Sequence, residues 1–124
     1  ENITQIFSTS EIIPSAGQGV IALQCRKDDQ AMINLLKKVN HKKTHCCVLA
    51  ERNVLKVLEG DCETPVGVLA KIKSNKALIE AELFSLDGKK RFYMKASKKL
   101  SLAKDLGKEV GELLKKRSKN SYKR

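Results

Sequence analysis

The spacing of apolar residues predicts two amphipathic helices in the first half of the chain. After Asp28 and Asp29, which are good helix N-caps, apolar residues recur at helical spacing up to Val39. A second helix is predicted from about Thr44 to Glu59, and Gly60 then favours a C-cap because glycine takes the left-handed conformation freely. The apolar positions at helical spacing in the first helix are Ala31, Met32, Leu35, Leu36 and Val39. In the second helix one stripe contains Val48, Glu51, Leu55 and Leu58, and it is widened by Cys47, Ala50 and Val54.

Alternation of apolar and polar residues predicts three strands further along the chain. They cover residues 66–73, 77–86 and 91–96. Ser74-Asn75 and Asp87-Gly88 separate the runs as turn signals, and Asp87-Gly88 is typical of hairpin turns. We therefore expect the three strands to form an antiparallel sheet.

A last helix is predicted from about residue 100 to residue 116. Gly107 and Gly111 each weaken it by about 1 kcal/mol relative to alanine, and we expect them to let the helix lie close to the sheet. A helix, three strands and a helix in this order predict an α+β domain whose sheet is covered by helices on one face. The inward-facing residues of the last helix are Leu102, Ala103, Leu106, Val110, Leu113 and Leu114.

Residues 1–37 do not fit this domain. Pro14, Gly17 and Gly19 mark a turn, and the apolar run from Val20 to Cys25 predicts a buried strand whose partner strands are not in the chain. We interpret this region as a fragment of neighbouring α/β structure, and the chain as a piece of a longer protein. Its exposed apolar residues favour association between copies.

Composition narrows the class of protein. The chain has 124 residues, enough for one compact domain, and 41% of them are hydrophobic. It has no apolar run of the roughly 18 residues that a membrane-spanning helix needs, and no pattern of a secretory signal. These features disfavour a membrane protein and a secreted disulfide scaffold, and we expect a cytoplasmic protein with reduced thiols.

The charge is strongly positive and unevenly distributed. The chain has 25 Lys and Arg against 14 Asp and Glu, and residues 91–124 contain twelve basic residues against three acidic ones, a net +9. Such a segment attracts polyanions: nucleic acid, an acidic small molecule or acidic lipid. The favoured interpretation is a solubilising, partly disordered tail over residues 115–124.

The cysteines and histidines give a weak metal-binding signal. The chain has four cysteines, Cys25, Cys46, Cys47 and Cys62, without a C-x-x-C pair. His41 and His45 are four residues apart, so a helix would bring them to one face. A polar helix start explains them better than a metal site, and we predict no metal ligands.

Two further motifs carry little chemistry. Gly17-Gln18-Gly19 lacks the third glycine of a nucleotide-binding loop and precedes an apolar run rather than a helix start. Glu51-Arg52 resembles a functional pair, but an internal salt bridge or a packing role is the favoured interpretation.

Cys62 is the most promising reactive residue. It lies in a predicted loop between Gly60 and Pro65, which suits an accessible thiol. Its acidic neighbours Asp61 and Glu63 are not the cationic groups that activate a catalytic thiol. The position therefore suits a cysteine that reacts once with a strong electrophile, although a buried structural cysteine is an equal alternative.

Two motifs stand out in the sequence: residues 51–67, ERNVLKVLEGDCETPVG, and residues 14–19, PSAGQG. The first resembles the cofactor-attachment motif of the porphobilinogen deaminase family, also called hydroxymethylbilane synthase. The second resembles the P-A-x-G-Q-G motif of the same family. The resemblance extends from Ile12 to the last helix. Two residues depart from the family pattern: Asp61 stands where a small residue, usually glycine, precedes the cysteine, and Ser15 replaces alanine.

The resemblance implies a function in tetrapyrrole (haem) biosynthesis. Members of this family are transferases that join four porphobilinogen molecules into hydroxymethylbilane and release ammonia. By the same resemblance Cys62 holds the dipyrromethane cofactor through a thioether, and Gln18 and Gly19 form a possible active-site hinge. The catalytic aspartate and most substrate-binding arginines lie in the N-terminal domains, so no catalytic residue is assigned here and we expect this chain alone to be inactive.

The resemblance also divides the chain. Residues 1–19 would close the second domain of the enzyme, residues 20–37 would return to the first domain as a strand and a helix, and residues 38–124 would form the C-terminal cofactor-attachment domain.

Two alternatives remain. One is a small basic nucleic-acid-binding module, which rests on the charge of residues 91–124 and on Tyr122, although five aromatic residues are few for a base-stacking surface. The other is a structural fragment in which Cys62 is buried and unreactive.

Overall fold

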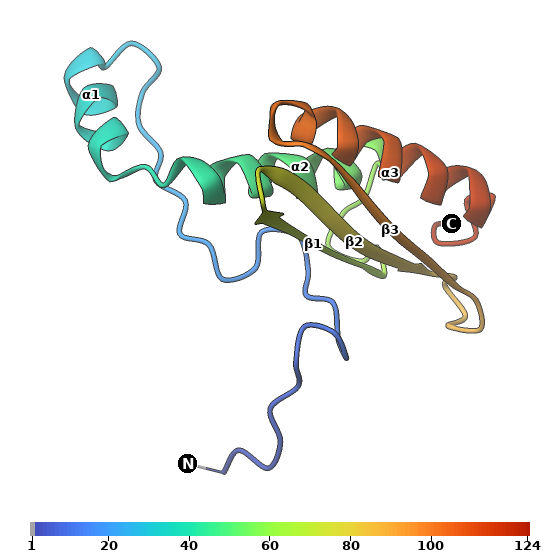
Figure 1. Cartoon of the computed structure of the whole chain (residues 1–124). Coiled ribbons are helices and arrows are strands. Elements are labelled where there is room, and N and C mark those ends of the chain that lie inside the picture. Colours follow the sequence, from blue (N-terminus) through green and yellow to red (C-terminus); the bar gives the residue numbers. More distant parts are fainter. Residues whose placement is uncertain (1) are drawn as a thin grey trace.

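Two helices, α2 (Lys42–Leu58) and α3 (Ala103–Ser118), lie side by side across one face of a three-stranded sheet (Figure 1). The structure is a computed structural model and describes residues 2–124. The sheet has the order β1-β2-β3 and is antiparallel throughout, which confirms the α+β prediction. The strands are β1 (Val66–Lys73), β2 (Lys76–Phe84) and β3 (Arg91–Lys99), and the short 3-10 helix η1 (Leu100–Leu102) leads into α3.

The predicted hairpin connections are present. Ser74 and Asn75 both have positive φ, at 48° and 58°, and join β1 to β2 in a two-residue turn that pairs Lys73 with Lys76. The second connection is longer, because β2 ends at Phe84 and the chain needs six residues to return.

The core lies between the two helices and the sheet. The buried residues come from α2, the inner face of the sheet, α3 and the tail. Its fully buried side chains include Val54, Leu58, Val68, Ile79, Leu83, Leu106, Val110 and Leu114. Leu102 and Leu113 are exposed, so the prediction that they face inward is wrong: they flank the buried stripe of α3.

The glycines of α3 allow close packing against α2, not against the sheet as predicted. A Cβ at Gly107 would lie 2.1 Å from the carbonyl oxygen of Ala50, and a Cβ at Gly111 would lie 2.8 Å from the Cβ of Val57. At both positions any residue other than glycine would require α2 to move. The two glycines therefore let α3 approach α2 closely.

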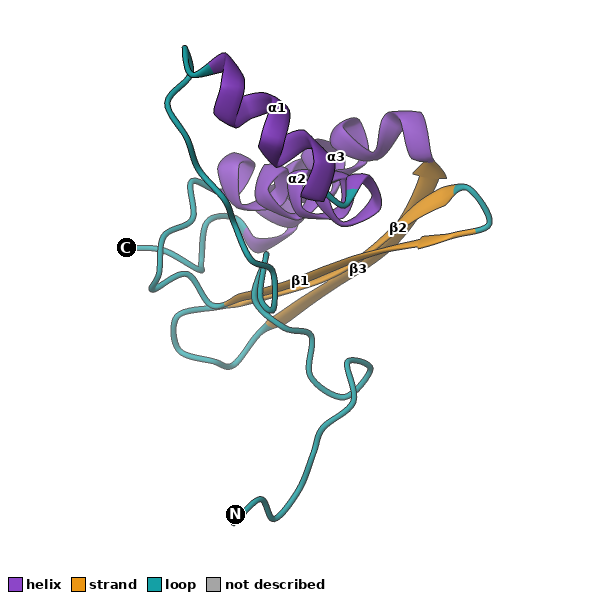
Figure 2. Cartoon of the chain, turned by 90° about the vertical axis from the view of Figure 1, so that its left-hand side faces the viewer, coloured by secondary structure: helices purple, strands orange, loops and turns teal. Residues whose placement is uncertain are grey.

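Residues 2–39, here called the N-terminal arm, extend away from this domain (Figures 1 and 2). The arm contains one helix, α1 (Gln30–Val39), which confirms the predicted helix, but none of its residues is buried. Residues 20–25 form no strand, contrary to the prediction. Their apolar pattern suits a strand, but backbone groups pair only where a neighbouring strand is available, and within the described residues none lies beside them.

The arm touches the domain along the start of β1. The backbone N–H of Val68 donates to the carbonyl oxygen of Pro14 at 2.8 Å, and Ile13 is buried. A Cβ at Gly67 would lie 2.6 Å from the carbonyl oxygen of Ile13, so glycine is required where the two segments meet.

Both helices of the domain end in left-handed residues that are not glycine. Glu59 has φ 55° at the end of α2, so the prediction of a left-handed Gly60 is off by one residue. Lys119 and Asn120 have φ 50° and 59° after α3 and reverse the chain. The tail then packs back on the domain, with Tyr122 only 1% exposed, which overturns the expectation of a partly disordered tail. Within residues 2–124 no helix combines the length and the hydropathy that crossing a membrane requires.

Candidate functional site

Cys62 lies in the loop of residues 60–65, between the end of α2 and the start of β1, and it is exposed. This exposure excludes the interpretation of a buried structural cysteine. The loop has its own hydrogen bonds on both sides of the thiol. The Asp61 carboxylate accepts from the backbone N–H of Glu63 and from the Thr64 hydroxyl, both at 3.0 Å, and the Asp61 N–H donates to the Thr64 hydroxyl at 3.0 Å.

These contacts explain how Asp61 replaces the usual glycine. Asp61 is not in the left-handed region, so the backbone at this position does not need glycine. The hydrogen bond from the N–H of Glu63, followed by that from Thr64, lowers the pKa of the Asp61 carboxyl. The ionised carboxylate therefore closes the turn that carries Cys62.

The end of α2, which directly precedes this loop, is held by side chains from the C-terminal part of the chain. The Glu59 carboxylate lies 2.6 Å from the ammonium of Lys123 and 3.2 Å from that of Lys115, and these contacts lower the pKa of Glu59, the Lys123 hydrogen bond most. The Tyr122 hydroxyl donates to the carbonyl oxygen of Leu58 at 2.9 Å. The sequence contains no local signal for these long-range pairs, so the contacts of Lys115, Tyr122 and Lys123 with the end of α2 were not predicted.

Gln18 and Gly19, the possible hinge, lie in a closed turn. Gly17 and Gly19 have φ 73° and 76°, the Gln18 N–H donates to the carbonyl oxygen of Ser15 at 3.1 Å, and the Ser15 N–H donates to the Gln18 side chain at 3.2 Å. The glycines on the two sides of Gln18, one on each side, give this segment backbone freedom that other residues lack.

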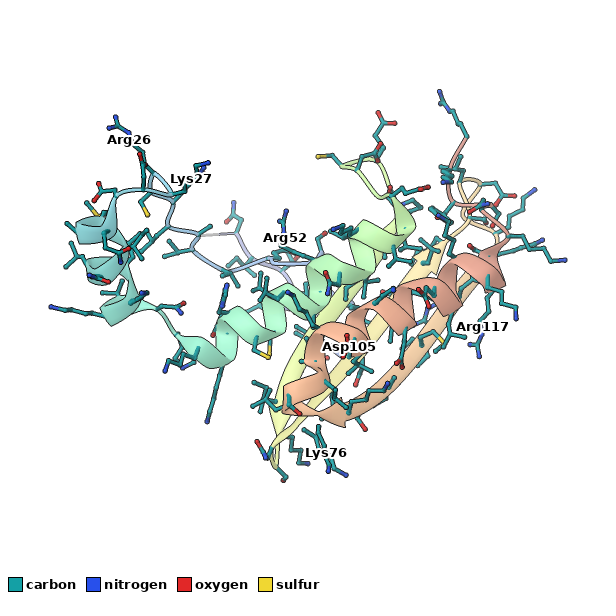
Figure 3. The ribbon with its side chains drawn as sticks, turned by 90° about the horizontal axis from the view of Figure 1, so that it is seen from above. Arg26, Lys27, Arg52, Lys76, Asp105 and Arg117 are labelled. Carbon is teal, nitrogen blue, oxygen red and sulfur yellow. The ribbon has the colours of Figure 1, made fainter. Side chains whose placement is uncertain are left out.

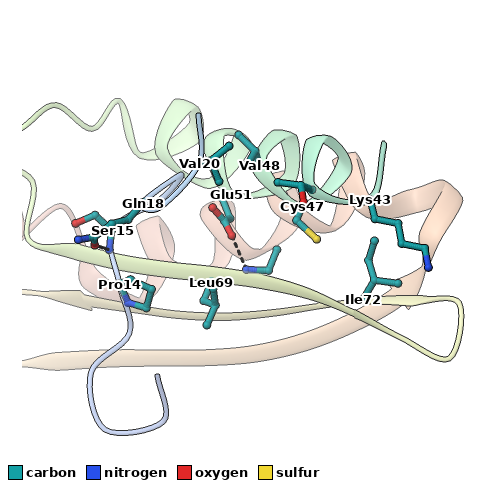
Figure 4. Close-up of a pocket in the computed structure, with 12 residues that line it drawn as sticks. Pro14, Ser15, Gln18, Val20, Lys43, Cys47, Val48, Glu51, Leu69 and Ile72 are labelled. Atoms are coloured by element: carbon teal, nitrogen blue, oxygen red, sulfur yellow. Dashed lines mark hydrogen bonds between the residues drawn. The ribbon is translucent and has the colours of Figure 1, made fainter. Parts of the chain in front are cut away.

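Glu51 connects this turn to the domain. It is 5% exposed, and its two carboxylate oxygens accept from the N–H of Gly17 and the N–H of Ala70, each at 2.7 Å. Figure 4 shows the side chain reaching from α2 toward β1 beside the arm. Glu51 thus has the structural role that the sequence favoured over a functional Glu51-Arg52 pair, and Arg52 is exposed.

A cavity of about 310 Å³ lies at this junction (Figure 4). Its lining combines the arm, the first half of α2 and the outer strand β1. Gln18 lines it and Cys62 does not, so the structure does not bring the two predicted site elements into one cavity. Cys47 also lines it, and burial, with smaller effects from Cys46 and Glu51, raises the pKa of the Cys47 thiol, which keeps it protonated.

One residue of the possible metal site, His41, has another role. His41 is the N-cap of α2, where its Nδ1 accepts from the N–H of Thr44 at 3.4 Å, as expected for a polar helix start. Among residues 2–124, no three His, Cys, Asp or Glu side chains are grouped as metal ligands would be.

Basic residues lie at both ends of the molecule. Arg26 and Lys27 lie beside α1, and Arg117 lies at the opposite end of the molecule (Figure 3). Half of the twelve basic residues after position 90 are in ion pairs with acidic side chains: Arg91, Lys95, Lys98, Lys108, Lys115 and Lys123. Tyr122 is buried, so this aromatic residue is not available for base stacking.

A family model and individual proteins that are similar to this chain point to the same family. Residues 45–116, more than half of the chain, match the family model described as "Porphobilinogen deaminase, C-terminal domain". The chain is 37% identical over 112 residues to a porphobilinogen deaminase of Desulforamulus reducens, with 90% of this chain and 36% of that protein covered. It is 38% identical over 114 residues to the one of Staphylococcus carnosus, with 91% and 36% covered. It is 45% identical over 83 residues to the one of Coxiella burnetii, with 67% and 27% covered. The chain thus spans about a third of the length of these relatives.

Proposed function

The chain belongs to the porphobilinogen deaminase family, whose C-terminal domain it contains, and from this premise we propose that it is part of a transferase of tetrapyrrole biosynthesis. The parent protein joins four porphobilinogen molecules head to tail into hydroxymethylbilane and releases ammonia. The observation that carries the proposal is the exposed Cys62, in a loop braced by Asp61 and Thr64, within the sequence that matches the family.

Cys62 is the proposed attachment point of the dipyrromethane cofactor, through a thioether. The residues present suit this role, because the thiol is exposed while the two residues that brace its loop are hydrogen-bonded to each other. The bound cofactor supplies the pyrrole ring from which the product chain grows. The loop holds the sulfur outside the core, so groups attached to it stay accessible to solvent and to the rest of the parent protein.

The arm belongs, in this proposal, to the other two domains of the parent protein. Residues 1–19 end the second domain, residues 20–37 return to the first, and residues 38–124 form the third. The support is that α1 buries none of its residues, while Ile21 and Leu35 are exposed apolar residues. Gln18 and Gly19 are the proposed hinge, supported by the left-handed glycines and by the Glu51 contact that ties the turn to the third domain.

The first test is a peptide mass map of the parent protein, purified in active form. We expect the Cys62 peptide to carry an added mass equal to two linked pyrrole units, and the peptides with Cys25, Cys46 and Cys47 to be unmodified. A Cys62→Ser variant should lack the adduct and the activity. An active parent protein with unmodified Cys62 would contradict the proposal.

The second test uses the 124-residue chain alone. We expect no release of ammonia and no bilane from porphobilinogen, because the catalytic aspartate of the family has no counterpart assigned in this chain. Formation of either product by the chain would show that its own residues suffice for catalysis.

A further inference from the structure

We propose that the C-terminal tail positions the Cys62 loop by holding the last turn of α2. We call Lys115, Tyr122 and Lys123 the C-terminal clamp. The inference rests on the proposed function only for its effect on catalysis, because the clamp itself is defined by contacts within the chain.

The first contact of the clamp is a buried hydrogen bond. The hydroxyl of Tyr122 donates to the carbonyl oxygen of Leu58 at 2.9 Å, while its ring belongs to the hydrophobic core. Leu58 is the last residue of α2, where carbonyl groups have no partner further along the helix. Tyr122 therefore satisfies a polar group that would otherwise be buried without a partner.

The second contact is ionic. Glu59 follows directly after α2, and its carboxylate lies between the ammonium groups of Lys123, at 2.6 Å, and Lys115, at 3.2 Å. Lys115 also donates to the carbonyl oxygen of Val57 at 3.4 Å. Positive groups at this end of a helix are favourable because the backbone dipoles make it negative.

These contacts explain why glutamate occupies a left-handed position. An L-residue with a side chain is disfavoured at φ 55°, and glycine is the usual residue where a helix ends this way. The two lysines hold the Glu59 carboxylate, so the side chain that makes the conformation costly also anchors it. The same conformation directs the backbone N–H of Gly60 to the carbonyl oxygen of Leu55 at 2.9 Å.

The tail is itself anchored to the sheet side of the domain. After the reversal at Lys119 and Asn120, the N–H of Ser121 donates to the carbonyl oxygen of Ser118 at 3.0 Å. The carbonyl oxygen of Ser121 accepts from the N–H of Leu86, in the connection between β2 and β3, at 2.9 Å. Through these contacts the clamp fixes the end of α2 relative to the sheet and to α3.

The clamp contacts Leu58 and Glu59, the two residues that directly precede the loop. Cys62 is three residues after Glu59, and the other end of the loop is held because β1 begins at Val66. With the last turn of α2 held, both ends of the loop have fixed positions, and Cys62 is confined to the span between them. Release of the clamp lets the first of these ends fray, so the sulfur samples a wider range of positions.

Hydrogen exchange of the full 124-residue chain tests this inference. Tyr122→Phe removes only the hydroxyl, and Lys123→Gln removes one charge at the surface. For Tyr122→Phe we expect exchange at Gly60 and Thr64 to quicken roughly five- to tenfold, the factor expected from the loss of one hydrogen bond, with a smaller rise for Lys123→Gln. Lys123→Arg keeps the positive charge and should exchange at the wild-type rate.

Matched controls are available within the chain. Tyr93→Phe changes the other tyrosine, which is exposed on β3, and Lys116→Gln changes an exposed lysine next to Lys115. Neither should alter exchange at residues 60–64. The inference is overturned if Tyr122→Phe leaves exchange there unchanged, or if exchange rises equally at the buried amides of β2, since a uniform rise reports only a less stable fold.

The consequence for catalysis is measured in the parent protein. With the cofactor adduct present on Cys62, we expect Tyr122→Phe to lower kcat more than it changes KM, because the variant retains the adduct but positions it less well. An unmodified wild-type Cys62 would contradict the proposed function, and the exchange measurement would still decide whether the clamp exists.

Discussion

The helices α1 and α3 are both amphipathic, yet they differ completely in burial. None of the ten residues of α1 is buried, whereas α3 buries seven, including Leu106, Val110 and Leu114. Both helices have the apolar spacing that indicates a helix with one buried face. The comparison teaches that such spacing identifies the face to be buried but not the surface that covers it. For α3 that surface is α2 and the sheet, and for α1 it is not among the described residues.

The largest difference between the two regions should appear in paired leucine substitutions. Leu114→Ala, in the core, should lower the free energy of unfolding by about 3 kcal/mol, because it removes apolar contacts and leaves a cavity. Leu35→Ala, in α1, should change it by less than about 0.5 kcal/mol, because Leu35 is 55% exposed in this chain. Urea unfolding of the 124-residue chain measures both. Similar effects for the two variants would contradict the exposure of α1 in the structure.

A smaller effect is expected where the two regions meet. In Glu51→Gln the side chain keeps one oxygen, which can accept from the N–H of either Gly17 or Ala70. The amide NH₂ would then face the N–H of the remaining residue, donor against donor. We expect a loss of about 1–3 kcal/mol, the cost of a buried polar group without its partner, and faster exchange of the Gly17 amide. Arg52→Gln, at the exposed neighbouring position, is the control and should be near neutral. Equal protection of Gly17 in both variants would show that Glu51 does not hold the arm.

The smallest effect is expected from acid titration. Hydrogen bonds, from Lys123 to Glu59 and from the N–H of Glu63 to Asp61, hold the pKa values of these carboxyls below 4.5 and 3.8. A lowered folded-state pKa contributes stability that is present above the unfolded-state pKa and is lost as the pH falls through the folded-state value. Thermal unfolding midpoints should therefore be nearly constant from pH 7 to about pH 5 and decline below about pH 4.

The titration also separates the two regions. Glu11, in the arm, likewise has a lowered pKa, caused mainly by the hydroxyl of Ser8. Glu59→Gln should reduce the acid-induced decline of the unfolding midpoint. Glu11→Gln should leave it unchanged, because Ser8 and Glu11 lie in an exposed part of the arm. An equal effect of the two variants would contradict the division into a stable domain and a separate arm.

Local patterns predicted most of the domain. The three strands and their two turns followed from the spacing of apolar residues and from turn dipeptides, because these signals lie within a few residues of each other. The presence of α1 in the arm followed from the same kind of spacing. The loop position of Cys62 followed from the residues around it in the same way. The extent of α3 was predicted to within about three residues at each end.

The errors at residues 20–25 and in the tail share one physical cause, which is dependence on distant partners. The apolar run of residues 20–25 has the composition of a strand but no neighbouring strand to pair with. Tyr122 lies in a lysine-rich tail whose composition predicts disorder. Its burial follows from contact with Leu58, 64 residues earlier in the chain.

The sequence by itself determined the α+β order, the antiparallel hairpins and the loop that carries Cys62, because short-range propensity and side-chain alternation decide these features. Only the tertiary structure decided that Gly107 meets the backbone of Ala50, that Glu51 joins the arm to β1, and that the tail holds the end of α2. These features depend on atoms brought together from distant positions, and their energies come from packing and from buried polar groups that exist only in the folded chain.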